Sequence, residues 1–344
     1  TLGGDKFRDE YSLSFDGTND YVDCGDVSAF DIQSFTISAW IKINDVDYNG
    51  ILNYYDSNKG YNFFVNNNGV LRAYIGDNSG ANSLLAGTAL VANKWYHCAT
   101  TYTSGTRKIY LNGVEDGSSS TAVTITFPSG SLIIGEAIDA YMNGNVSDVA
   151  IYSSALTSSQ VKTIYNGREP YNHKEGVASS NLVGWWRMGD GALDGFNLIG
   201  DEVTPTLGSD LVTNGGFDTD SDWTKGTDWS IDTTDGVAKG DSTTDNLIQS
   251  DIVEVGKHYK ITYTIKDYVA GSVRVELSTD TSAGVTRSSN GTFTETLKAN
   301  STYIAFDART SFTGSIDNVK VYEVNGNSGI MTNMASDDFT GDTP

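Results

Sequence analysis

The sequence is short of basic residues, histidine and long apolar runs, and each shortage excludes a class of protein. Its 22 lysines and arginines stand against 44 acidic residues, which gives a formal charge of −22. Such a chain cannot neutralise a row of phosphates, so we expect no nucleic-acid partner. No apolar run reaches the roughly 20 residues that a membrane-spanning helix needs, so we expect no membrane insertion. The three histidines, His97, His173 and His258, lack the spacing of a zinc site.

Cysteine is also scarce. Cys24 and Cys98 leave two interpretations open, one disulfide bridge or two unpaired thiols that behave as small apolar residues. The first residue is Thr1 rather than methionine, so we expect a processed product, a fragment or the visible part of a longer protein. The acidic excess suits solubility at high ionic strength or the binding of divalent cations, and both fit an extracellular or marine setting.

Thr, Ser, Gly, Asn and Tyr are abundant and proline occurs only four times, a composition that favours β-structure. Asn112-Gly113 predicts a type I′ hairpin turn, and the run from Asn66 to Gly69 predicts a second hairpin. Alternation of apolar and polar residues predicts many short strands, which is typical of a sandwich or barrel. These strands are residues 11–15, 35–43, 61–65, 70–75, 95–102, 108–111, 131–134 and 145–152.

One short helix is predicted after this region. Thr157 and Gln160 form a capping box at its start, and Gly167 marks its C-terminal end. The apolar residues of one helix face are Val161, Ile164 and Tyr165. We expect the helix to cover one end of the sandwich.

A second alternating region follows a different stretch that is rich in Gly and Asp. Its predicted strands are residues 253–255, 258–265, 272–277, 292–297, 302–306 and 316–322. The fold class is therefore all-β, with two β-sandwich (jelly-roll) domains in tandem joined by a Gly/Asp-rich linker, and one short helix. The expected boundaries are a first sandwich at 1–168, a linker with a docking strand at 169–210, a second sandwich at 211–324 and a polar C-terminal tail at 325–344.

Tryptophan positions add two expectations. Trp40 and Trp95 lie in alternating strands, so we expect both in the core. Trp185 and Trp186 are adjacent in one strand of the linker and cannot both face the same side. We expect one of them to anchor a neighbouring domain or chain.

The first region resembles the laminin-G-like, concanavalin A-like family, including its pentraxins. The resemblance rests on blocks that occur in the family's order, at residues 13–22, 35–42, 94–102, 108–113 and 144–152, followed by Ala155-Leu156-Thr157 and the helix. It implies a jelly-roll sandwich that presents a binding surface. Cys98 matches the second pentraxin cysteine, but Ala39 stands at the position of the first, which puts the pentraxin disulfide in doubt.

The second region resembles carbohydrate-binding modules of the galactose-binding-like type. The similar segments are residues 211–218 with Trp223 after them, and the closing residues 314–322. A further resemblance, to laminin-G-like virion proteins of tailed marine bacteriophages, rests on residues 185–190 and 329–344. In those proteins the two segments lie closer together, which implies that the second sandwich is an insertion.

Catalytic constellations are missing from the sequence. Glycosidases on a concanavalin A-like scaffold need two carboxylates that flank the scissile bond, and no predicted strand carries Glu-x-Asp-x-Glu. No Gly-x-Ser-x-Gly elbow or phosphate loop occurs. We therefore expect no enzyme activity. A glycosidase with a site assembled from distant residues is the third hypothesis, which a reducing-sugar assay on laminarin, agar and alginate would test.

Calcium is the one cofactor that we expect, in a structural role that pins strand ends. Turn carboxylates and amides supply the hard oxygens that calcium prefers, although such residues also cap their own turns. The candidate ligands are Asp16, Asn19, Asp20 and Asp148 in the first domain, and Asn214, Asp218 and Asp317 in the second.

Sugars stack their C–H faces on aromatic rings, so exposed aromatics are the candidate ligand-binding residues. They are Tyr54, Tyr55, Tyr61 and Tyr74 with nearby Tyr48 in the first domain, and Trp223, Trp229 and Tyr268 in the second.

The leading hypothesis for function is a non-catalytic virion structural or adsorption protein: a fibre, decoration or tail component on the virion surface. Its partners would be glycans or host-surface polysaccharide, other virion proteins and further copies of itself in a homo-oligomer. The alternative is a secreted, extracellular bacterial adhesin, or the carbohydrate-binding region of a polysaccharide-degrading enzyme. Neighbouring genes for capsid or tail proteins would favour the first, and an upstream hydrolase domain the second.

Overall fold

The fold is defined, in a computed structural model, for residues 9–25, 28–137, 140–191, 194, 198–203, 206–278 and 283–344. The chain forms two compact units, each with its own apolar core. Unit 1 combines Thr1–Pro205 with Gly326–Pro344, and unit 2 is Thr206–Asn325. The all-β class expected from the sequence is confirmed. Within the described ranges, no helix has the length and apolar character to cross a membrane.

Unit 1 is built from two antiparallel sheets of eight strands each, here sheet A and sheet B. Sheet A has the order β10-β9-β8-β3-β14-β1-β28, and β15 also pairs with β14. Its strands are β1 (Ser12–Asp16), β3 (Phe35–Ile43), β8 (Trp95–Thr103), β9 (Thr106–Leu111), β10 (Val114–Ser119), β14 (Asn143–Tyr152), β15 (Leu182–Trp186) and β28 (Phe339–Thr340).

Sheet B has the order β16-β27-β2-β11-β4-β5-β6-β7. Its strands are β2 (Tyr21–Asp23), β4 (Asn49–Asp56), β5 (Lys59–Val65), β6 (Val70–Asp77), β7 (Ala81–Ala89), β11 (Ile133–Ile134), β16 (Leu198–Ile199) and β27 (Gly329–Thr332). A short hairpin of β12 (Glu136–Ala137) and β13 (Ala140–Tyr141) packs against β4.

Alternate residues of the two sheets meet in the main core of unit 1. Ile37 and Ile41 of β3, for example, belong to the same buried cluster as Phe63 of β5. Burying one such side chain fully contributes roughly 1.5–3 kcal/mol. Because side chains alternate along a strand, each sheet packs one face into this core and has a second face that points away from it.

The predicted turn and helix signals are confirmed. Asn112 and Gly113 both have positive φ, 49° and 75°, as a type I′ turn requires. At the start of α1 (Ser158–Tyr165), Thr157 Oγ1 accepts from the Gln160 N–H at 3.3 Å, and Gln160 Oε1 accepts from the Thr157 N–H at 2.9 Å. The helix ends at Asn166 in the left-handed conformation, one residue before the expected Gly167.

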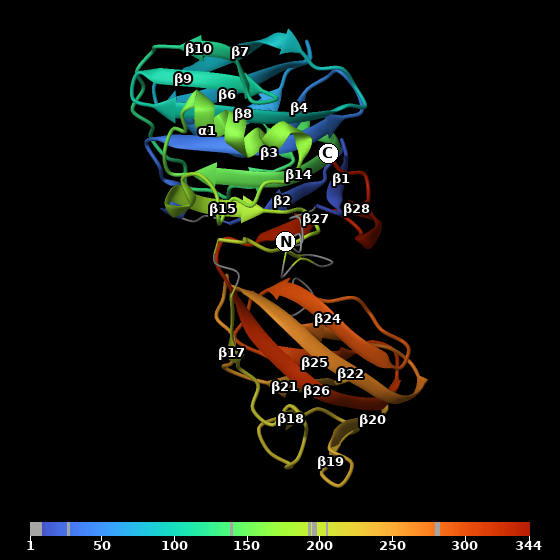
Figure 1. Cartoon of the computed structure of the whole chain (residues 1–344). Coiled ribbons are helices and arrows are strands. Elements are labelled where there is room, and N and C mark those ends of the chain that lie inside the picture. Colours follow the sequence, from blue (N-terminus) through green and yellow to red (C-terminus); the bar gives the residue numbers. More distant parts are fainter. Residues whose placement is uncertain are drawn as a thin grey trace, which may run out of the picture. The chain divides into compact units, whose positions relative to one another are not determined.

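A second, smaller apolar cluster covers the outer face of sheet A. Figure 1 shows α1 in front of β3 and β8, where its Val161 and Ile164 join Tyr110, Tyr152 and Trp185. Because α1 and the segment after it bury this face, strands β14 and β15 are covered on both sides.

The docking strand expected in the linker is present as β15, and the segments expected to be a linker and a C-terminal tail belong to unit 1. β15 extends sheet A beside β14, β16 pairs with β27, and β27 also pairs with β2. β28 lies beside β1. Their short apolar runs are surrounded by Gly and Asp, so the sequence pattern alone looked like a connection rather than sheet edges.

Both adjacent tryptophans are buried, on opposite faces of β15. The Trp186 ring belongs to the main core, and its Nε1 donates to the Asn327 carbonyl at 2.9 Å. The Trp185 ring belongs to the cluster under α1. The expectation of a tryptophan anchor to another domain or chain is therefore replaced by burial within unit 1.

The two cysteines are buried free thiols. Cys98 lies opposite Ala39 in the β3–β8 register. The position that the pentraxin resemblance gives to the first cysteine is thus beside Cys98 but holds alanine, and that bridge is not made.

Unit 2 is a second sandwich, with a six-stranded and a four-stranded antiparallel sheet. The larger has the order β19-β20-β26-β22-β24 with β17 beside β26, and Figure 1 shows its long strands β22 and β26 side by side. Its strands are β17 (Thr206–Asp210), β19 (Trp229–Asp232), β20 (Val237–Thr243), β22 (His258–Ala270), β24 (Gly291–Lys298) and β26 (Phe312–Asn325). The smaller contains β18 (Thr224–Lys225), β21 (Asn246–Gln249), β25 (Ile304–Ala308) and β23 (Val273–Glu276).

Candidate functional site

The outer face of strands β4 to β7 in sheet B carries a continuous row of aromatic rings. Alternation turns Tyr61, Phe63 and their strand neighbours into the core, so the residues between them face outward. The register aligns Asn53 with Asn62, Asn62 with Tyr74, and Phe64 with Arg72 across the outer side. We call this surface the aromatic face.

Four rings make up the row on the aromatic face. Tyr48, just before β4, stacks on Phe64 with ring centres 6.2 Å apart. Phe64 meets Tyr74 edge to face at 5.3 Å, and Tyr74 lies 6.1 Å from Tyr55. Tyr48 is 44% exposed, whereas Phe64 is buried beneath its neighbours. The row therefore offers accessible rings at the surface that are fixed from below.

Polar groups accompany the rings. The Asn62 amide donates to Asn53 Oδ1 at 3.0 Å, and Asn62 Oδ1 is buried without a hydrogen-bond partner among the described residues. The Arg72 guanidinium lies 4.5 Å from the Tyr74 ring centre and donates to Ser83 Oγ at 3.3 Å. Stacking surfaces beside amides and a guanidinium suit a ligand that is apolar on one side and rich in hydroxyl groups on the other.

The sequence-predicted tyrosines of unit 1 divide between the two sides of sheet B. Tyr55 and Tyr74 lie on the aromatic face. Tyr54 and Tyr61 point the opposite way and are buried in the core, where their hydroxyls donate to Asp31 Oδ1 at 2.7 Å and to the Phe30 carbonyl at 3.0 Å. As ligand-binding residues these two predictions are wrong, because adjacent strand positions face opposite sides.

Sequence reasoning missed Phe64, Asn62 and Arg72. Their signal was the strand period: once Tyr61, Phe63 and Val65 are taken as the core set, the residues between them must face outward. The nearly continuous apolar run at 61–65 hid that alternation.

The three aromatic residues predicted in unit 2 do not form a comparable surface. Trp223 and Trp229 are buried in the core, and their indoles donate to the carbonyls of Asn214 and Asp245 at 3.1 and 2.8 Å. Tyr268 is half-buried, and its hydroxyl donates to the Gly271 carbonyl at 2.9 Å. The two tryptophans therefore stabilise the fold of unit 2 rather than face a ligand.

Unit 2 instead has a polar groove of about 470 Å³ on the larger sheet. Hydroxyl and charged side chains dominate its lining, which comprises Ser230, Lys239, Gly240, Asp241, Asp267, Thr313, Gly314 and Ser315. Such a lining can hydrogen-bond to a ligand but gives it no stacking surface. The aromatic face is the stronger candidate.

The calcium candidates of unit 1 do not assemble into one site. Asp16 Oδ1 accepts from the Thr18 N–H at 2.7 Å, and Asp20 Oδ2 accepts from the Asp16 N–H at 2.9 Å, so these carboxylates cap their own turn, which also contains Asn19. Asp148 lies elsewhere: Asp16 pairs with Asn143, five residues before Asp148 along β14. At about 3.4 Å per residue this separates them by roughly 17 Å.

The calcium candidates of unit 2 have other partners as well. The Asn214 amide donates to the carbonyls of Thr219 and Ser221 at 2.7 and 3.0 Å, and so takes up oxygens that a cation would need. Asp317 is ion-paired with Lys266, and Asp218 is exposed. In the part of the chain that the structure describes, no three Asp, Glu, His or Cys side chains converge as metal ligands.

These residues therefore do not fit calcium in the arrangement that the structure shows. Calcium dependence stays a prediction of the sequence, which melting in calcium chloride and in EGTA tests. A higher melting temperature in calcium chloride than in EGTA would support that prediction, and equal melting temperatures would contradict it.

A buried polar network lies beneath α1, centred on Asp148. Its Oδ2 lies 3.2 Å from His173 Nε2, and its Oδ1 accepts from the Trp185 indole N–H. The Tyr152 hydroxyl contacts His173 Nδ1 at 2.5 Å. Burial opposes the charge, but His173 and the Trp185 hydrogen bond together lower the pKa of Asp148. Because every member is enclosed, the network is structural.

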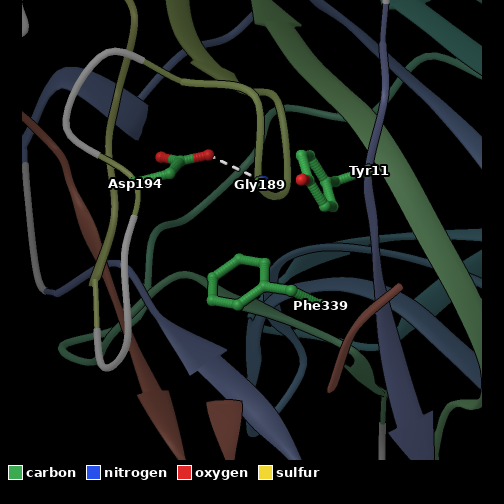
Figure 2. Close-up of a pocket in the computed structure, with 4 residues that line it drawn as sticks. All are labelled: Tyr11, Gly189, Asp194 and Phe339. Atoms are coloured by element: carbon green, nitrogen blue, oxygen red, sulfur yellow. Dashed lines mark hydrogen bonds between the residues drawn. The ribbon is translucent and has the colours of Figure 1, made fainter. Parts of the chain in front are cut away.

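Figure 2 shows Gly189 beside the Tyr11 side chain, with the Phe339 ring and the Asp194 carboxylate nearby. These four residues line a small cavity, whose volume is about 210 Å³. The Asp194 carboxylate accepts from the N–H groups of Gly189, Gly191 and Gly200 at 2.7, 2.9 and 2.6 Å. Burial raises the pKa of Asp194 to about 6 in spite of these bonds. The carboxylate thus holds a loop together.

Comparison with known proteins identifies the fold of unit 1. Residues 16–162 match the Laminin_G_3 family model, described as the concanavalin A-like lectin/glucanases superfamily. The matched range lies wholly inside unit 1 and includes the aromatic face. Residues 16–162 of unit 1 are therefore similar to concanavalin A-like lectins and glucanases. No protein of curated function matches the chain in sequence.

Several solved structures overlap with the chain in part. A candidate carbohydrate-binding protein from Bacteroides ovatus shares 21% identity at TM-score 0.43, over 57% of this chain and 56% of that one. A pentraxin from Limulus polyphemus shares 19% at TM-score 0.37, over 49% and 85%. The sialidase module CBM40 of Ruminococcus gnavus, bound to α2,3 sialyllactose, shares 12% at TM-score 0.38, over 45% and 96%. At this level of overlap, none of them determines a ligand for this chain.

Proposed function

We propose that the protein is a non-catalytic glycan-binding protein and that the aromatic face of unit 1 is its ligand surface. The observation that carries the proposal is the continuous row of Tyr48, Phe64, Tyr74 and Tyr55 on one side of sheet B. The match of the surrounding residues to a superfamily of lectins and glucanases supports the glycan-binding part of the proposal.

The chemistry of the face suits a saccharide. A pyranose ring can lie with its C–H side on Tyr48 or Tyr74, and an aromatic contact of this kind contributes roughly 0.5–1.5 kcal/mol. Asn53 and Arg72 lie beside these rings and supply hydrogen-bonding groups for hydroxyls. Several rings in a row suit an extended chain of sugars better than a single residue.

The non-catalytic part of the proposal rests on the side chains of this face. Glycoside hydrolysis requires a pair of carboxylates on the two sides of the bond. Asn53, Asn62, Phe64, Arg72 and Tyr74 occupy central outward positions of the paired strands, and Asp77 at the end of β6 is the acid whose charge reaches Tyr55. We infer that one such acid does not make a catalytic pair. Release of reducing ends from laminarin, agar or alginate by the purified protein would contradict it.

A glycan array tests the ligand surface. Wild type is expected to bind a restricted set of glycans, and Tyr74→Ala to lose that binding because Tyr74 is the middle ring that touches both Phe64 and Tyr55. The Tyr263→Phe variant, altered in the core of unit 2, serves as a control that keeps binding. An unchanged array pattern for Tyr74→Ala would remove the aromatic face from consideration.

For the biological setting we propose attachment of a virus particle to a glycan-bearing host surface. Support comes from the resemblance of residues 185–190 and 329–344 to segments of phage virion proteins. Labelling intact particles with an antibody to this chain, followed by electron microscopy, tests the setting separately from glycan binding. Particles without the chain would leave a secreted adhesin as the remaining setting.

A further inference from the structure

A further pocket of unit 1 lies on the outer face of sheet A, whereas the aromatic face belongs to sheet B. Its volume is about 450 Å³. It lies near the start of β8 and is lined by Trp40, Lys94, Trp95, Tyr96, Asn112 and Pro344. The expectation that Trp95 is a core residue is wrong, because this side chain is only half-buried.

The floor of this pocket is rigid. The Trp40 ring is buried. Its centre lies 5.7 Å from the centre of the Tyr165 ring of α1 and 5.3 Å from the centre of the His97 ring, which it meets edge to face. Burial lowers the pKa of His97 to about 3, so the floor carries no charge at neutral pH. The accessible indole is that of Trp95, which is half-buried, and it gives a flat ligand an apolar surface to lie on.

Two of the residues that line the pocket, Asn112 and Lys94, offer hydrogen-bond donors. Asn112 Oδ1 accepts a hydrogen bond from the backbone N–H of His97 at 3.0 Å. The NH₂ group of the Asn112 side chain is therefore the part that can donate to a ligand. Lys94 is exposed and carries its ammonium at the rim. An ammonium and an amide NH₂ complement an anionic group with several acceptor oxygens.

The chain itself shows that a carboxylate is stabilised here. Asp342 accepts from the Trp95 indole Nε1 at 2.9 Å and is ion-paired with Lys42. Its backbone carbonyl accepts from Ser12 Oγ at 2.6 Å, so the segment is fixed beside the pocket. Lys42 is neutralised by its ion pair with Asp342, so Lys94 is the lysine that the pocket lining offers to a ligand.

We propose that this pocket binds a carboxylate-bearing sugar, with the sugar ring on Trp95 and the carboxylate on Lys94. Aromatic walls alone would accept neutral and acidic sugars alike. The ammonium at the rim selects the acidic ones. The inference is independent of the aromatic face, because it concerns another sheet and another set of side chains.

Titration calorimetry with uronic-acid trisaccharides tests the proposal. The probes are the trisaccharides of galacturonate, glucuronate and mannuronate, each compared with its methyl ester, which lacks the negative charge and adds one methyl group per sugar. Wild type is expected to bind at least one acid about tenfold more tightly than its ester. Lys94→Gln is expected to weaken the binding of that acid about tenfold and to leave the binding of the ester unchanged.

The control variant is Lys174→Gln, which removes the same charge from another exposed lysine of unit 1 and is expected to bind like wild type. Three results would each overturn the proposal: no binding of any acid, equal binding of acid and ester, or Lys94→Gln equal to wild type. If Tyr74→Ala weakened binding of the acid and Lys94→Gln did not, the acid would bind at the aromatic face. That result would exclude this pocket and leave the proposed function in place.

Discussion

At the scale of single residues, the buried carboxylate of Asp148 is the acceptor on which the network beneath α1 depends. Replacing it with alanine would leave the His173 ring and the Trp185 N–H without their acceptor in an enclosed site. Removing one partner from such a network costs roughly 3–5 kcal/mol. We therefore expect Asp148→Ala to lower the free energy of unfolding by about that amount in urea titrations followed by tryptophan fluorescence.

Asp148→Asn is the matched control for this prediction. It keeps an acceptor oxygen and tolerates the left-handed backbone at this position, where φ is 52°. Its loss of stability should be clearly smaller than that of the alanine variant. Equal losses would mean that the network does not depend on the acceptor.

A second residue-scale prediction concerns pH and Glu276 in unit 2. Burial and the neighbouring Asp307 raise the pKa of Glu276 to about 7 from its ordinary 4.5, against the opposing effect of Arg274. The folded-state pKa is therefore above the unfolded one. The contribution of this group to stability is complete below about pH 4.5 and is lost as the pH rises through about 7.

Glu276→Gln removes this titration. We expect the melting temperature of the variant, relative to wild type, to be higher at about pH 8 than at about pH 5. Glu254→Gln changes an exposed acid and should show no such trend. If the difference for Glu276→Gln were the same at both pH values, the raised pKa would be contradicted.

At the scale of elements, the turn between β9 and β10 is coupled to α1. A Cβ placed on Gly113 would lie 3.0–3.2 Å from the Tyr165 ring, and the residue has φ of 75°. Gly105 also has positive φ, 93°, but a Cβ there would meet nothing within 4 Å. The two glycines thus share backbone strain and differ in packing.

We expect Gly105→Ala to cost about 1 kcal/mol, the usual penalty of a left-handed alanine, and Gly113→Ala to cost at least about 1 kcal/mol more. Urea unfolding of the two variants measures the difference. Equal costs would show that α1 does not pack against this turn in solution.

The elements also show what sequence patterns can and cannot predict. Alternation located β3 correctly, and the capping box located the start of α1, because both signals are local. The apolar run at β15 also located a strand, but it did not show that Trp185 and Trp186 are both buried within unit 1. A strand covered on both faces has no polar side, and what covers it comes from distant parts of the chain.

The candidate site was predictable only in part for a similar reason. Tyrosine clustering indicated the strands that carry the aromatic face and included Tyr55 and Tyr74. It did not indicate which side of the sheet each tyrosine faces. That assignment needs the strand register, and the bulge in the β4–β5 pairing shifts it between Gly50 and Leu52. The pocket around Trp95 brings Asn112 and Pro344 together across the chain, which no local pattern contains.

At the scale of the whole molecule, unit 2 is inserted into unit 1. In unit 1, β16 and β27 pair just before and just after the insertion, with Ile199 opposite Gly329. In unit 2, Thr206 at its start pairs with Asn325 at its end. Both ends of the insertion are thus close together within each unit, as domain insertion requires.

We therefore expect unit 1 to fold when a short Gly-Ser linker replaces residues 206–325, and residues 206–325 to fold alone. Cooperative thermal unfolding of each, followed by circular dichroism, is the measurement. A chain cut after residue 325 lacks β27 and β28 and should lose the cooperative transition of unit 1. Retention of that transition would contradict the assignment of these strands to unit 1.

The most direct test of the central claim, glycan binding at the aromatic face, is the dissociation constant of the best array ligand for two tyrosine variants. Tyr48 and Tyr11 are each 44% exposed, but only Tyr48 belongs to the aromatic row. Calorimetry should show Tyr48→Ala weakened about tenfold, which is about 1.4 kcal/mol, and Tyr11→Ala equal to wild type. Equal affinity of Tyr48→Ala and wild type would contradict the claim.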